Sequence, residues 1–251
     1  MKIAIVTGAS SGMGKEFVQQ IDRACNDLDQ IWVVARSVDS TEFTDTKAEI
    51  VRIPLDLTQS YAEAIFTARL QAENPQIKIL VNSAGFGKLG KFAEVPLDIQ
   101  TDMVECNNIA LMKMCHWCIP YMVKGGYIIN MASVAAFMPQ MRFAIYAASK
   151  AFVLSFSRAL HYELKNKKIS VTAVCPGPVK TAFFDTAEEY GYTLVIKKYI
   201  MAKPEKVVAL ALSDAKARKQ VSVYGPLMKG MRILTKFVPK RVLLDGYDKM
   251  V

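Results

Sequence analysis

Residues 3–14 read IAIVTGASSGMG, a short apolar run that passes directly into a stretch with three glycines. Such a run is typical of a buried parallel strand, and the residues from Gly12 to Ala24 follow with the apolar spacing of a helix. Glycines between a strand and a helix permit a tight turn and close approach of a phosphate to the helix N-terminus. The spacing is GxxxGxG rather than the commoner GxGxxG, and a turn without a ligand is the alternative. The sequence therefore predicts a dinucleotide-binding loop with these contacts: Gly8, Ser10, Ser11, Gly12, Met13 and Gly14.

The rest of the chain alternates strand-like and helix-like segments. Further strands are predicted at residues 31–35, 49–53, 77–81, 127–131, 169–175 and near 221–223. Helices are predicted at residues 58–73, 97–123, 147–163 and near 204–213, and Gly125-Gly126 is expected to end the longest of them. This alternation implies βαβ units and a parallel sheet that is covered on both faces. We therefore expect a single α/β domain over residues 1–251, a doubly wound Rossmann-type fold with a mainly parallel seven-stranded sheet.

Composition argues against several classes of protein. Of 251 residues, 52% are hydrophobic and 22% are charged, which is ordinary for a soluble globular enzyme. No signal peptide is recognisable and no apolar run has the length of a membrane-spanning helix, so we expect a cytoplasmic protein. The five cysteines suggest no disulfide framework. Cys115 and Cys118 have CxxC spacing inside a helical stretch without a second ligand pair, so buried thiols are favoured over a metal or redox site.

The end of the second strand indicates which dinucleotide is preferred. A carboxylate there would accept a hydrogen bond from the ribose 2′-hydroxyl and would repel a 2′-phosphate. This chain has Arg36 and Ser37 instead, and a guanidinium forms charge-assisted hydrogen bonds with phosphate. The expected cofactor is NADP(H), and the alternative is a solvated surface arginine. After the third strand, Asp56 with Leu57 beside it is placed either to contact the adenine or to cap a helix that begins near Thr58.

Tyr146 and Lys150 lie four residues apart at the head of a predicted helix. Residues at this spacing share a helix face, so the phenol and the ammonium point into the same space. The ammonium favours the phenolate and is expected to lower the tyrosine pKa from its usual value of about 10, which makes the phenol a usable general acid. The same spacing recurs at Tyr199 and Lys203, where the other signals are missing.

Several motifs in a fixed order resemble those of the short-chain dehydrogenase/reductase family. They are the glycine loop at 7–14, NSAG at 82–85, Asn107, Ser133, the YxxxK of 146–150 and PGPVKT at 176–181. The resemblance extends to about residue 225. The family more often has a second asparagine where this chain has Ser83, a departure that leaves Asn82 and Gly85 intact.

The resemblance implies a role for each motif. It implies that Tyr146 exchanges a proton with the substrate oxygen, and that Ser133 holds this oxygen and stabilises developing charge. Asn107, rather than its neighbour Asn108, would hold a water that connects Lys150 to solvent. Lys150 would also bind the nicotinamide ribose, and the hydride would come from the cofactor. The further cofactor contacts that it implies are Asn82, Ala84, Gly85, Tyr146, Lys150, Pro176, Gly177, Val179 and Thr181.

Aromatic and methionine side chains predict an apolar substrate site. Residues 134–145 must pass near the reacting carbonyl, and in the resembled family the stretch after Thr181 forms a flap over the substrate, which we expect within 177–215. We predict a steroid-like or fatty carbonyl compound or alcohol as the substrate. The alternative is that the same residues pack in the core or at a subunit interface. The expected lining is Phe86, Phe137, Met138, Met141, Phe143, Phe183 and Phe184, with Tyr190 and Tyr192 in the flap.

The C-terminal tail, residues 226–251, is basic and amphipathic. Residues 197–251 hold 13 Lys or Arg and 4 Asp or Glu, an excess of 9 that equals the whole net charge of +9. The apolar face of the tail docks on the domain or on another subunit, which we favour, or it contacts an anionic membrane surface weakly. Nucleic-acid binding is not expected, because the charge is confined to one segment without aromatic platforms. The tail's apolar face holds Leu227, Met231, Leu234 and Val238, adjoined by Ile233 and Phe237, and its basic face holds Lys229, Arg232, Lys236 and Lys240.

Together these features predict an NADP(H)-dependent oxidoreductase that interconverts a ketone or aldehyde and its alcohol, with Tyr146 as general acid or base. We expect no metal, and a homodimer or homotetramer formed through the long helices, as the resemblance implies. One alternative is a non-catalytic NADP(H)-binding scaffold, against which the presence of Ser133, Tyr146 and Lys150 argues. The other is a peripheral membrane protein held by its tail.

Overall fold

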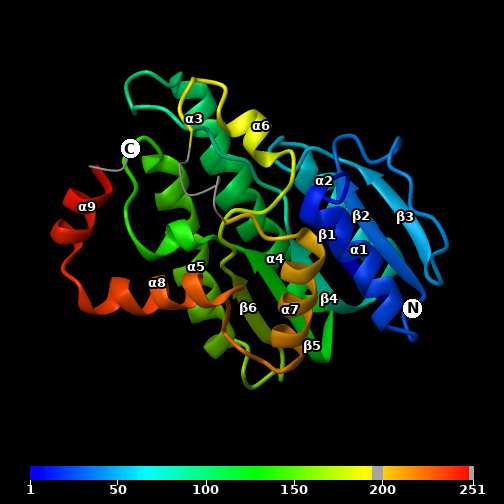
Figure 1. Ribbon diagram of the computed structural model, residues 1–251. Helices are drawn as coiled ribbons and strands as arrows, with labels where there is room; N and C mark the ends of the chain where they lie inside the picture. Colours follow the sequence, from blue (N-terminus) through cyan, green and yellow to red (C-terminus); the bar gives the residue numbers. More distant parts are fainter. Residues whose placement is uncertain (194–199, 249–251) are drawn as a thin grey trace.

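The computed structural model describes residues 1–193 and 200–248, and its centre is a seven-stranded sheet with parallel pairings throughout (Figure 1). The spatial order of the strands is β3-β2-β1-β4-β5-β6-β7, so the sheet grows in opposite directions from β1 and from β4. Open parallel sheets bind ligands at the carboxyl ends of the strands beside such a switch point. The prediction of a doubly wound Rossmann-type α/β fold is confirmed. The strands are β1 (Lys2–Thr7), β2 (Gln30–Ala35), β3 (Glu49–Pro54), β4 (Gln76–Asn82), β5 (Met122–Met131), β6 (Ser170–Val174) and β7 (Val221–Ser222).

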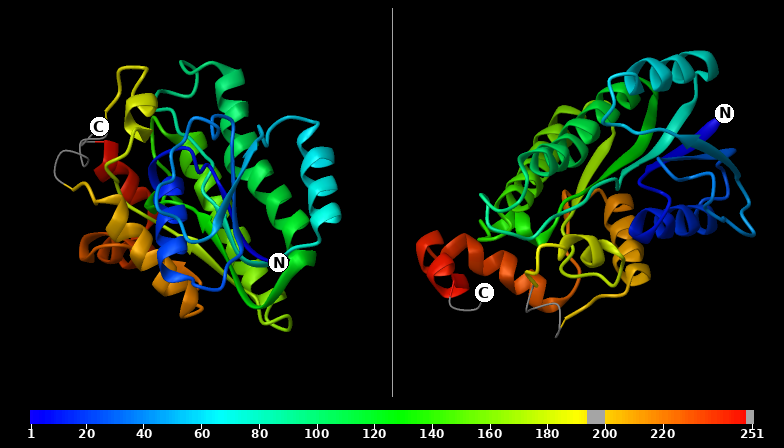
Figure 2. Two further views of the ribbon diagram at one scale, coloured as in Figure 1. Left: turned by 90° about the vertical axis from the view of Figure 1, so that its right-hand side faces the viewer. Right: turned by 90° about the horizontal axis from the view of Figure 1, so that it is seen from above.

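Helices cover both faces of the sheet (Figure 2). Helices α1 (Gly12–Ala24) and α7 (Pro204–Lys216) pack together on one face. The opposite face carries α2 (Ala62–Glu73), α4 (Leu111–Cys118) and α5 (Ala144–Glu163). Successive side chains of a strand point to opposite faces, so a strand covered on both sides has a continuous apolar run, as residues 3–6 of β1 do.

The helix that we predicted over residues 97–123 is interrupted and shorter. Helix α3 (Leu97–Val104) passes into a π-helical segment (Glu105–Ala110), which α4 follows, and a 3-10 turn (Ile119–Tyr121) ends the run. Pro120 lies in that turn, and proline cannot continue a helix because it lacks an amide proton and its ring clashes with the preceding turn. Gly125, with φ 88°, therefore lies inside β5 rather than at the end of a helix. Two other starts also differ from the prediction: α2 begins at Ala62 and α5 at Ala144.

The last two helices form an arm that extends away from the domain (Figures 1 and 2). The arm consists of α8 (Pro226–Phe237) and α9 (Lys240–Asp248), which are separated by Val238 and Pro239. Near the start of α8, Met228 is buried, whereas Leu227, which we predicted on the docked face, is exposed. Residues 249–251 of the predicted tail lie outside the described residues. In the described part of the chain, no helix combines the length and the apolarity needed to cross a bilayer.

Candidate active site

The glycine loop joins β1 to α1 at the carboxyl edge of the sheet, and two of its glycines are required by geometry. Gly8 has φ 66°, and a Cβ there would lie 2.7 Å from the backbone of Ala84. A Cβ on Gly14 would lie 2.0 Å from the carbonyl oxygen of Gly8, because α1 starts directly against the turn. Ser11 is the N-cap residue of α1, so the free amides of the first helical turn lie at this loop. Because the loop has no side chains at its glycines, a phosphate group can approach the N-terminus of α1 closely.

The turn after β4 is fastened to the end of β1. Thr7 Oγ1 accepts hydrogen bonds from the amides of Ser83 (3.1 Å) and Ala84 (3.2 Å). A Cβ on Gly85 would lie 2.7 Å from Asn107 Oδ1, so the turn can pass this close to the helices only as glycine. The glycine loop and this turn therefore form one continuous edge for a cofactor.

Asn82 shapes that edge from inside the core. Its Nδ2 donates to Asn130 Oδ1 at 2.8 Å, and Asn130 Nδ2 donates in turn to Ser157 Oγ at 2.9 Å. Asn82 therefore connects β4, β5 and α5 and does not border the cavity described below.

Ser133 and Tyr146 meet beside the carboxyl end of β5. Ser133 Oγ accepts from the amide of Ala135 at 3.2 Å, which makes it the N-cap of a 3-10 turn (Val134–Phe137). The side chain of Tyr146, in the first turn of α5, is hydrogen-bonded to that of Ser133. The tyrosine ring is stacked on Phe143, with centroids 4.2 Å apart, and lies 5.6 Å from the ring of Phe183. Packing thus fixes the position of the phenol.

Burial has the largest effect on the pKa values of this pair. It raises the pKa of Tyr146 to about 12, although the hydrogen bond with Ser133 lowers it. Lys150 Nζ lies 5.6 Å from the centroid of the Tyr146 ring and donates to the carbonyl oxygen of Met131 at 2.9 Å. Burial also lowers the pKa of Lys150 to about 8. The lowered tyrosine pKa that we predicted from the Tyr–Lys spacing is therefore wrong for this structure.

Lys150 has donors left for a ligand. An ammonium carries three N–H groups, and within the described part of the chain Lys150 Nζ donates one hydrogen bond, to the carbonyl oxygen of Met131. Lys150 is buried and borders the cavity, so its remaining donors fit the hydroxyl groups of a ribose.

Asn107 and Asn108 both lie in the π-helical segment, and both are buried. Asn107 Nδ2 donates to the carbonyl oxygen of Phe86 at 2.9 Å and to Ser149 Oγ at 3.1 Å, and its Oδ1 accepts from the amide of Phe86 at 3.0 Å. Asn108 Nδ2 donates to the carbonyl oxygen of Ser149 at 2.8 Å. Short π-helical segments occur frequently at functional sites. Here the segment ties the end of the 82–85 turn to the residue before Lys150.

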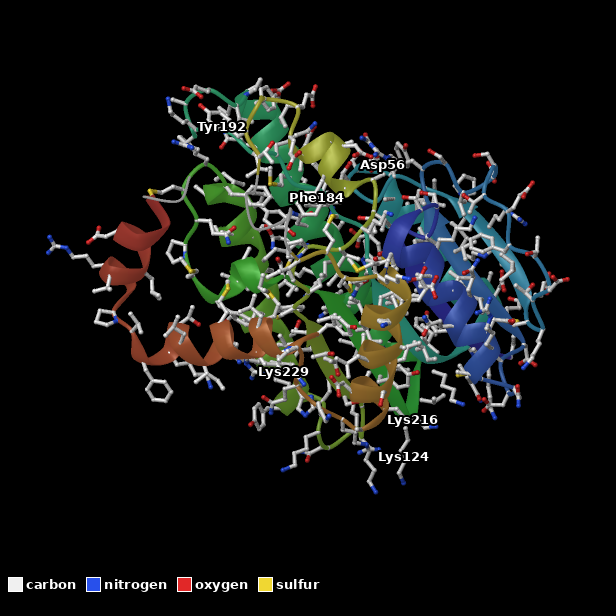
Figure 3. The ribbon with its side chains drawn as sticks, viewed as in Figure 1. Asp56, Lys124, Phe184, Tyr192, Lys216 and Lys229 are labelled. Carbon is white, nitrogen blue, oxygen red and sulfur yellow. The ribbon has the colours of Figure 1, made fainter. Side chains whose placement is uncertain are left out.

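The catalytic candidates border one cavity of about 840 Å³ with a mostly apolar lining. The glycine loop, the turn after β4 and the PGPV turn after β6 contribute to its cofactor side, and α6 (Phe183–Ala187) lies over it. Figure 3 shows Phe184 on the inner side of α6, toward the centre of the molecule. The arm forms a further wall. The lining includes Met13, Ser83, Gly85, Ser133, Met138, Gln140, Phe143, Tyr146, Lys150, Pro176, Gly177, Val179, Thr181, Phe183, Phe184, Met228, Met231, Leu234, Thr235, Val242 and Leu243.

The family model described as short chain dehydrogenase matches residues 2–190. The chain belongs to this family. A curated relative, "Probable oxidoreductase EphD" of Mycobacterium bovis, is 30% identical over 259 residues, which cover 94% of this chain and 43% of the relative. The chain thus spans less than half the length of that relative.

Two solved structures show the likeness in three dimensions. The short-chain dehydrogenase from Sphingobium yanoikuyae in complex with NADPH has a TM-score of 0.77 and 25% identity, over 96% of this chain and 97% of that one. The bulky-bulky ketone specific alcohol dehydrogenase from Comamonas testosteroni has a TM-score of 0.72 and 27% identity, over 96% of each chain.

The predicted substrate lining of this short-chain dehydrogenase is formed in part. Met138, Phe143, Phe183 and Phe184 border the cavity. Phe86 packs with the cluster around Tyr146, Phe137 packs against the core beneath α5, and Met141 is half-buried outside the lining. The sequence did not reveal how the 3-10 turn orients Phe137. Gln140 and the side chains from the arm were missed, although the apolar spacing of Met228 and Met231 was a signal for α8.

The predicted flap region, 177–215, divides into two parts. The first part lies over the cavity: Val179 pairs with Ala202, and α6 follows. The second part is α7, which belongs to the layer of helices on the sheet. Tyr192 donates to Glu94 Oε2 at 2.8 Å and holds the far end of the flap against the loop before α3 (Figure 3). Tyr190 lies close to Gly90 in that loop, and Tyr199 lies outside the described residues.

The turn after β6 connects the cofactor side to the arm. The carbonyl oxygen of Pro176 accepts from the amide of Val134 at 3.0 Å. A Cβ on Gly177 would lie 2.7 Å from Met228 Sδ, so glycine lets α8 dock against this turn. A Cβ on Gly12 would lie 3.5 Å from Thr181 Cγ2, which places the end of the turn beside the glycine loop.

The residues predicted for the adenosine end lie beyond this cavity. Arg36 and Ser37 are exposed at the end of β2, and Arg36 is in none of the ion pairs formed by the described part of the chain. Asp56 Oδ1 accepts from the amide (3.0 Å) and the hydroxyl (2.7 Å) of Thr58. Because α2 begins only at Ala62, the helix-cap alternative for Asp56 is wrong, and adenine contact stays a prediction. Leu57 is buried in the core, so only its backbone is available to a cofactor.

Metal chemistry has no ligand set among the residues that the structure describes, since no three His, Cys, Asp or Glu side chains gather there. Cys115 and Cys118 are free buried thiols, and burial raises the pKa of both.

The depressed pKa of Lys150 predicts a stability that rises with pH. Below pH 8 the lysine is charged in the folded and unfolded states, so the folded state carries the full cost of burying the ammonium. Between about pH 8 and pH 10.5 the folded state releases its proton first, and this cost disappears. We expect the free energy of unfolding of the wild type, relative to Lys150→Met, to increase through that window. Urea unfolding at several pH values measures this difference, and a difference independent of pH would contradict the burial of an ionisable Lys150.

Proposed function

We propose that this short-chain dehydrogenase is an NADP(H)-dependent oxidoreductase that interconverts a hydrophobic ketone or aldehyde and its alcohol. The observation that carries the proposal is Tyr146, a buried phenol that is hydrogen-bonded to Ser133 on the wall of an apolar cavity. The cavity also holds the Lys150 amine and adjoins a loop that fits phosphate. An acid, an oxygen-binding hydroxyl and a cofactor edge therefore meet at one place.

In the reduction direction, Tyr146 donates its proton to the carbonyl oxygen while the Ser133 hydroxyl holds that oxygen and stabilises its growing charge. The nicotinamide cofactor, when bound, supplies the hydride. Lys150 binds the ribose hydroxyls and, as an ammonium, favours the phenolate that proton transfer leaves on Tyr146. Asn107 and Ser149 keep the lysine-bearing turn of α5 in place. The oxidation direction reverses each step.

A bulky apolar substrate is supported by the composition of the cavity wall. Side chains of methionine, phenylalanine and leucine are frequent in it, and Gln140 and Thr235 add polar groups. Nicotinamide would occupy part of the 840 Å³, and the remainder extends toward the arm. The name of the Comamonas testosteroni relative also specifies a bulky-bulky ketone.

NADP(H) rather than NAD(H) is supported by Arg36. Its guanidinium is exposed at the end of β2 and unpaired with any carboxylate that the structure describes, so it is available to a 2′-phosphate. The cofactors bound to structures of this fold include both NADPH and NAD, and for this chain the preference rests on Arg36.

The proposal is tested by following NADPH oxidation with a panel of carbonyl compounds, which should include steroid ketones, fatty ketones and sugars, with NADH in parallel. We expect turnover of an apolar class with NADPH. Tight NADPH binding without turnover of any compound would instead favour a non-catalytic scaffold.

The same assay on Arg36→Asp tests the cofactor assignment. Losing a charge-assisted contact with the phosphate costs about 1.5–3 kcal/mol, so we expect the KM for NADPH to rise by about 10- to 100-fold, with improved use of NADH. Lys124→Asp makes the same change of charge at the far end of the molecule from Asp56 (Figure 3) and should leave the KM unchanged. Equal KM values for NADPH in Arg36→Asp and Lys124→Asp would show that Arg36 does not contact the 2′-phosphate of NADPH.

A further inference from the structure

The arm carries a group of exposed apolar side chains that no residue within 1–193 or 200–225 covers. Phe237 is 81% exposed, and Ile233 is 58% exposed. Exposed apolar residues are common singly, but a contiguous group on one element marks an interaction surface. We call this group the arm surface; its members are Leu227, Ile233, Leu234, Phe237 and Val242.

The arm surface is continuous with the lining of the catalytic cavity. Leu234 and Val242 border the cavity and are also 50% and 59% exposed. The buried Met228 and the half-buried Met231 and Thr235 continue the same wall inward, toward Tyr146. An apolar molecule would therefore meet apolar side chains from the outside of α8 to the catalytic tyrosine.

Cations lie next to this apolar surface. Lys229, Lys236 and Arg241 are exposed on the arm, and Figure 3 shows Lys229 on α8. Asp245 is the one carboxylate among the arm side chains that the structure describes. On α8, residues 229 and 236 lie on one side of the helix and residues 233 and 237 on the next, because successive residues are rotated by about 100°. Apolar side chains flanked by lysines match a membrane surface with anionic headgroups.

A second copy of this chain is the other candidate to cover the arm. A two-fold contact uses the same patch on both partners, and it would bring the lysines of one arm near those of the other. Anionic lipid headgroups carry the charge opposite to that of these lysines, whereas a second arm carries the same charge. The charge therefore favours a lipid surface.

We propose that the arm docks the enzyme on an anionic lipid bilayer, with Ile233 and Phe237 inserted at the headgroup boundary, and that the cavity opens toward the lipid between Leu234 and Val242. Its substrates are then carbonyl compounds or alcohols dissolved in the bilayer. The identity of these substrates rests on the proposed oxidoreductase function, whereas docking does not.

The test is co-sedimentation of the full-length protein with vesicles of phosphatidylcholine alone or of phosphatidylcholine mixed with phosphatidylglycerol. We expect binding to the mixed vesicles that weakens as salt is added, because the headgroup attraction is screened. Replacing both Ile233 and Phe237 by glutamate should reduce the vesicle partition coefficient by at least about 10-fold. Phe92, before α3, and Leu97, at the start of α3, are similarly exposed, at 60% and 72%, and their double glutamate variant is the matched control.

Activity with a water-soluble carbonyl compound separates docking from catalysis. Ile233 and Phe237 do not border the cavity, so their glutamate variant should keep this activity and lose activity only toward a ketone supplied in mixed vesicles. Absence of vesicle binding by the wild type, or equal loss in the control variant, would overturn the proposal. A change from dimer to monomer in the Ile233/Phe237 variant, without vesicle binding by the wild type, would assign the arm to a second copy. Vesicle binding without turnover of any carbonyl would refute the proposed function and leave docking intact.

Discussion

Tyr146→Phe is expected to lower kcat/KM for carbonyl reduction by about 10²- to 10⁴-fold, which is the usual contribution of a positioned general acid. The phenylalanine ring keeps the stacking on Phe143 and the contact with Phe183, and it loses only the hydroxyl that reaches Ser133. Affinity for NADPH should therefore be essentially unchanged. Steady-state kinetics and NADPH fluorescence titration measure the two quantities.

Tyr162→Phe is the matched control for this variant. Tyr162 lies on the same helix, α5, and is 64% exposed, so its hydroxyl should be dispensable. A Tyr146→Phe variant with a rate close to that of the wild type would refute the assignment of the acid. A parallel loss of NADPH affinity would show that the hydroxyl has a structural role at the cofactor side as well.

Gly14→Ala is expected to lower the free energy of unfolding by about 3 kcal/mol or more and to abolish NADPH binding. The added Cβ would lie 2.0 Å from the carbonyl oxygen of Gly8, and both partners are backbone that cannot move without displacing α1 from β1. Thermal and urea unfolding measure the stability, and fluorescence titration measures the binding.

Gly230→Ala provides the contrast. Apart from its chain neighbours and the backbone of its own helix, no described residue lies within 4 Å of a Cβ at Gly230, in the interior of α8, so alanine should stabilise the helix by about 0.5–1 kcal/mol. Equal free energies of unfolding for Gly14→Ala and Gly230→Ala would show that α1 does not lie as close to the glycine loop as described.

The sheet could be predicted from sequence because it depends on local patterns. Most strands contain a short apolar run that is followed within a few residues by glycine, proline or a polar residue, and burial on both faces of the central strands leaves little freedom in such runs. The ends of helices were less predictable. Gly125 was expected to end the long helical stretch, but the helix ends earlier, at the turn that holds Pro120, and β5 already starts at Met122.

The candidate catalytic residues were chosen from motif spacing, whereas their electrostatics depend on packing. The distance of four residues between Tyr146 and Lys150 does not report that Phe143 and Phe183 bury the phenol or that Met131 engages the lysine. The arm shows the same limit: amphipathicity identified a helix with an apolar face, but not that Met228 would dock while Phe237 stays outside.

The π-helical segment at Glu105–Ala110 has a consequence for redesign of this protein. Such a segment holds about one residue more per turn than an α-helix. Here it contains Asn107, whose buried side-chain amide is hydrogen-bonded to both the N–H and the C=O of Phe86. Converting this segment to α-helical geometry at unchanged length would rotate the side chains of α3 and α4 against each other by about 100°. A redesign that makes this helix regular to raise its thermal stability would therefore turn Asn107 away from Ser149 and break its hydrogen bonds to the backbone of Phe86.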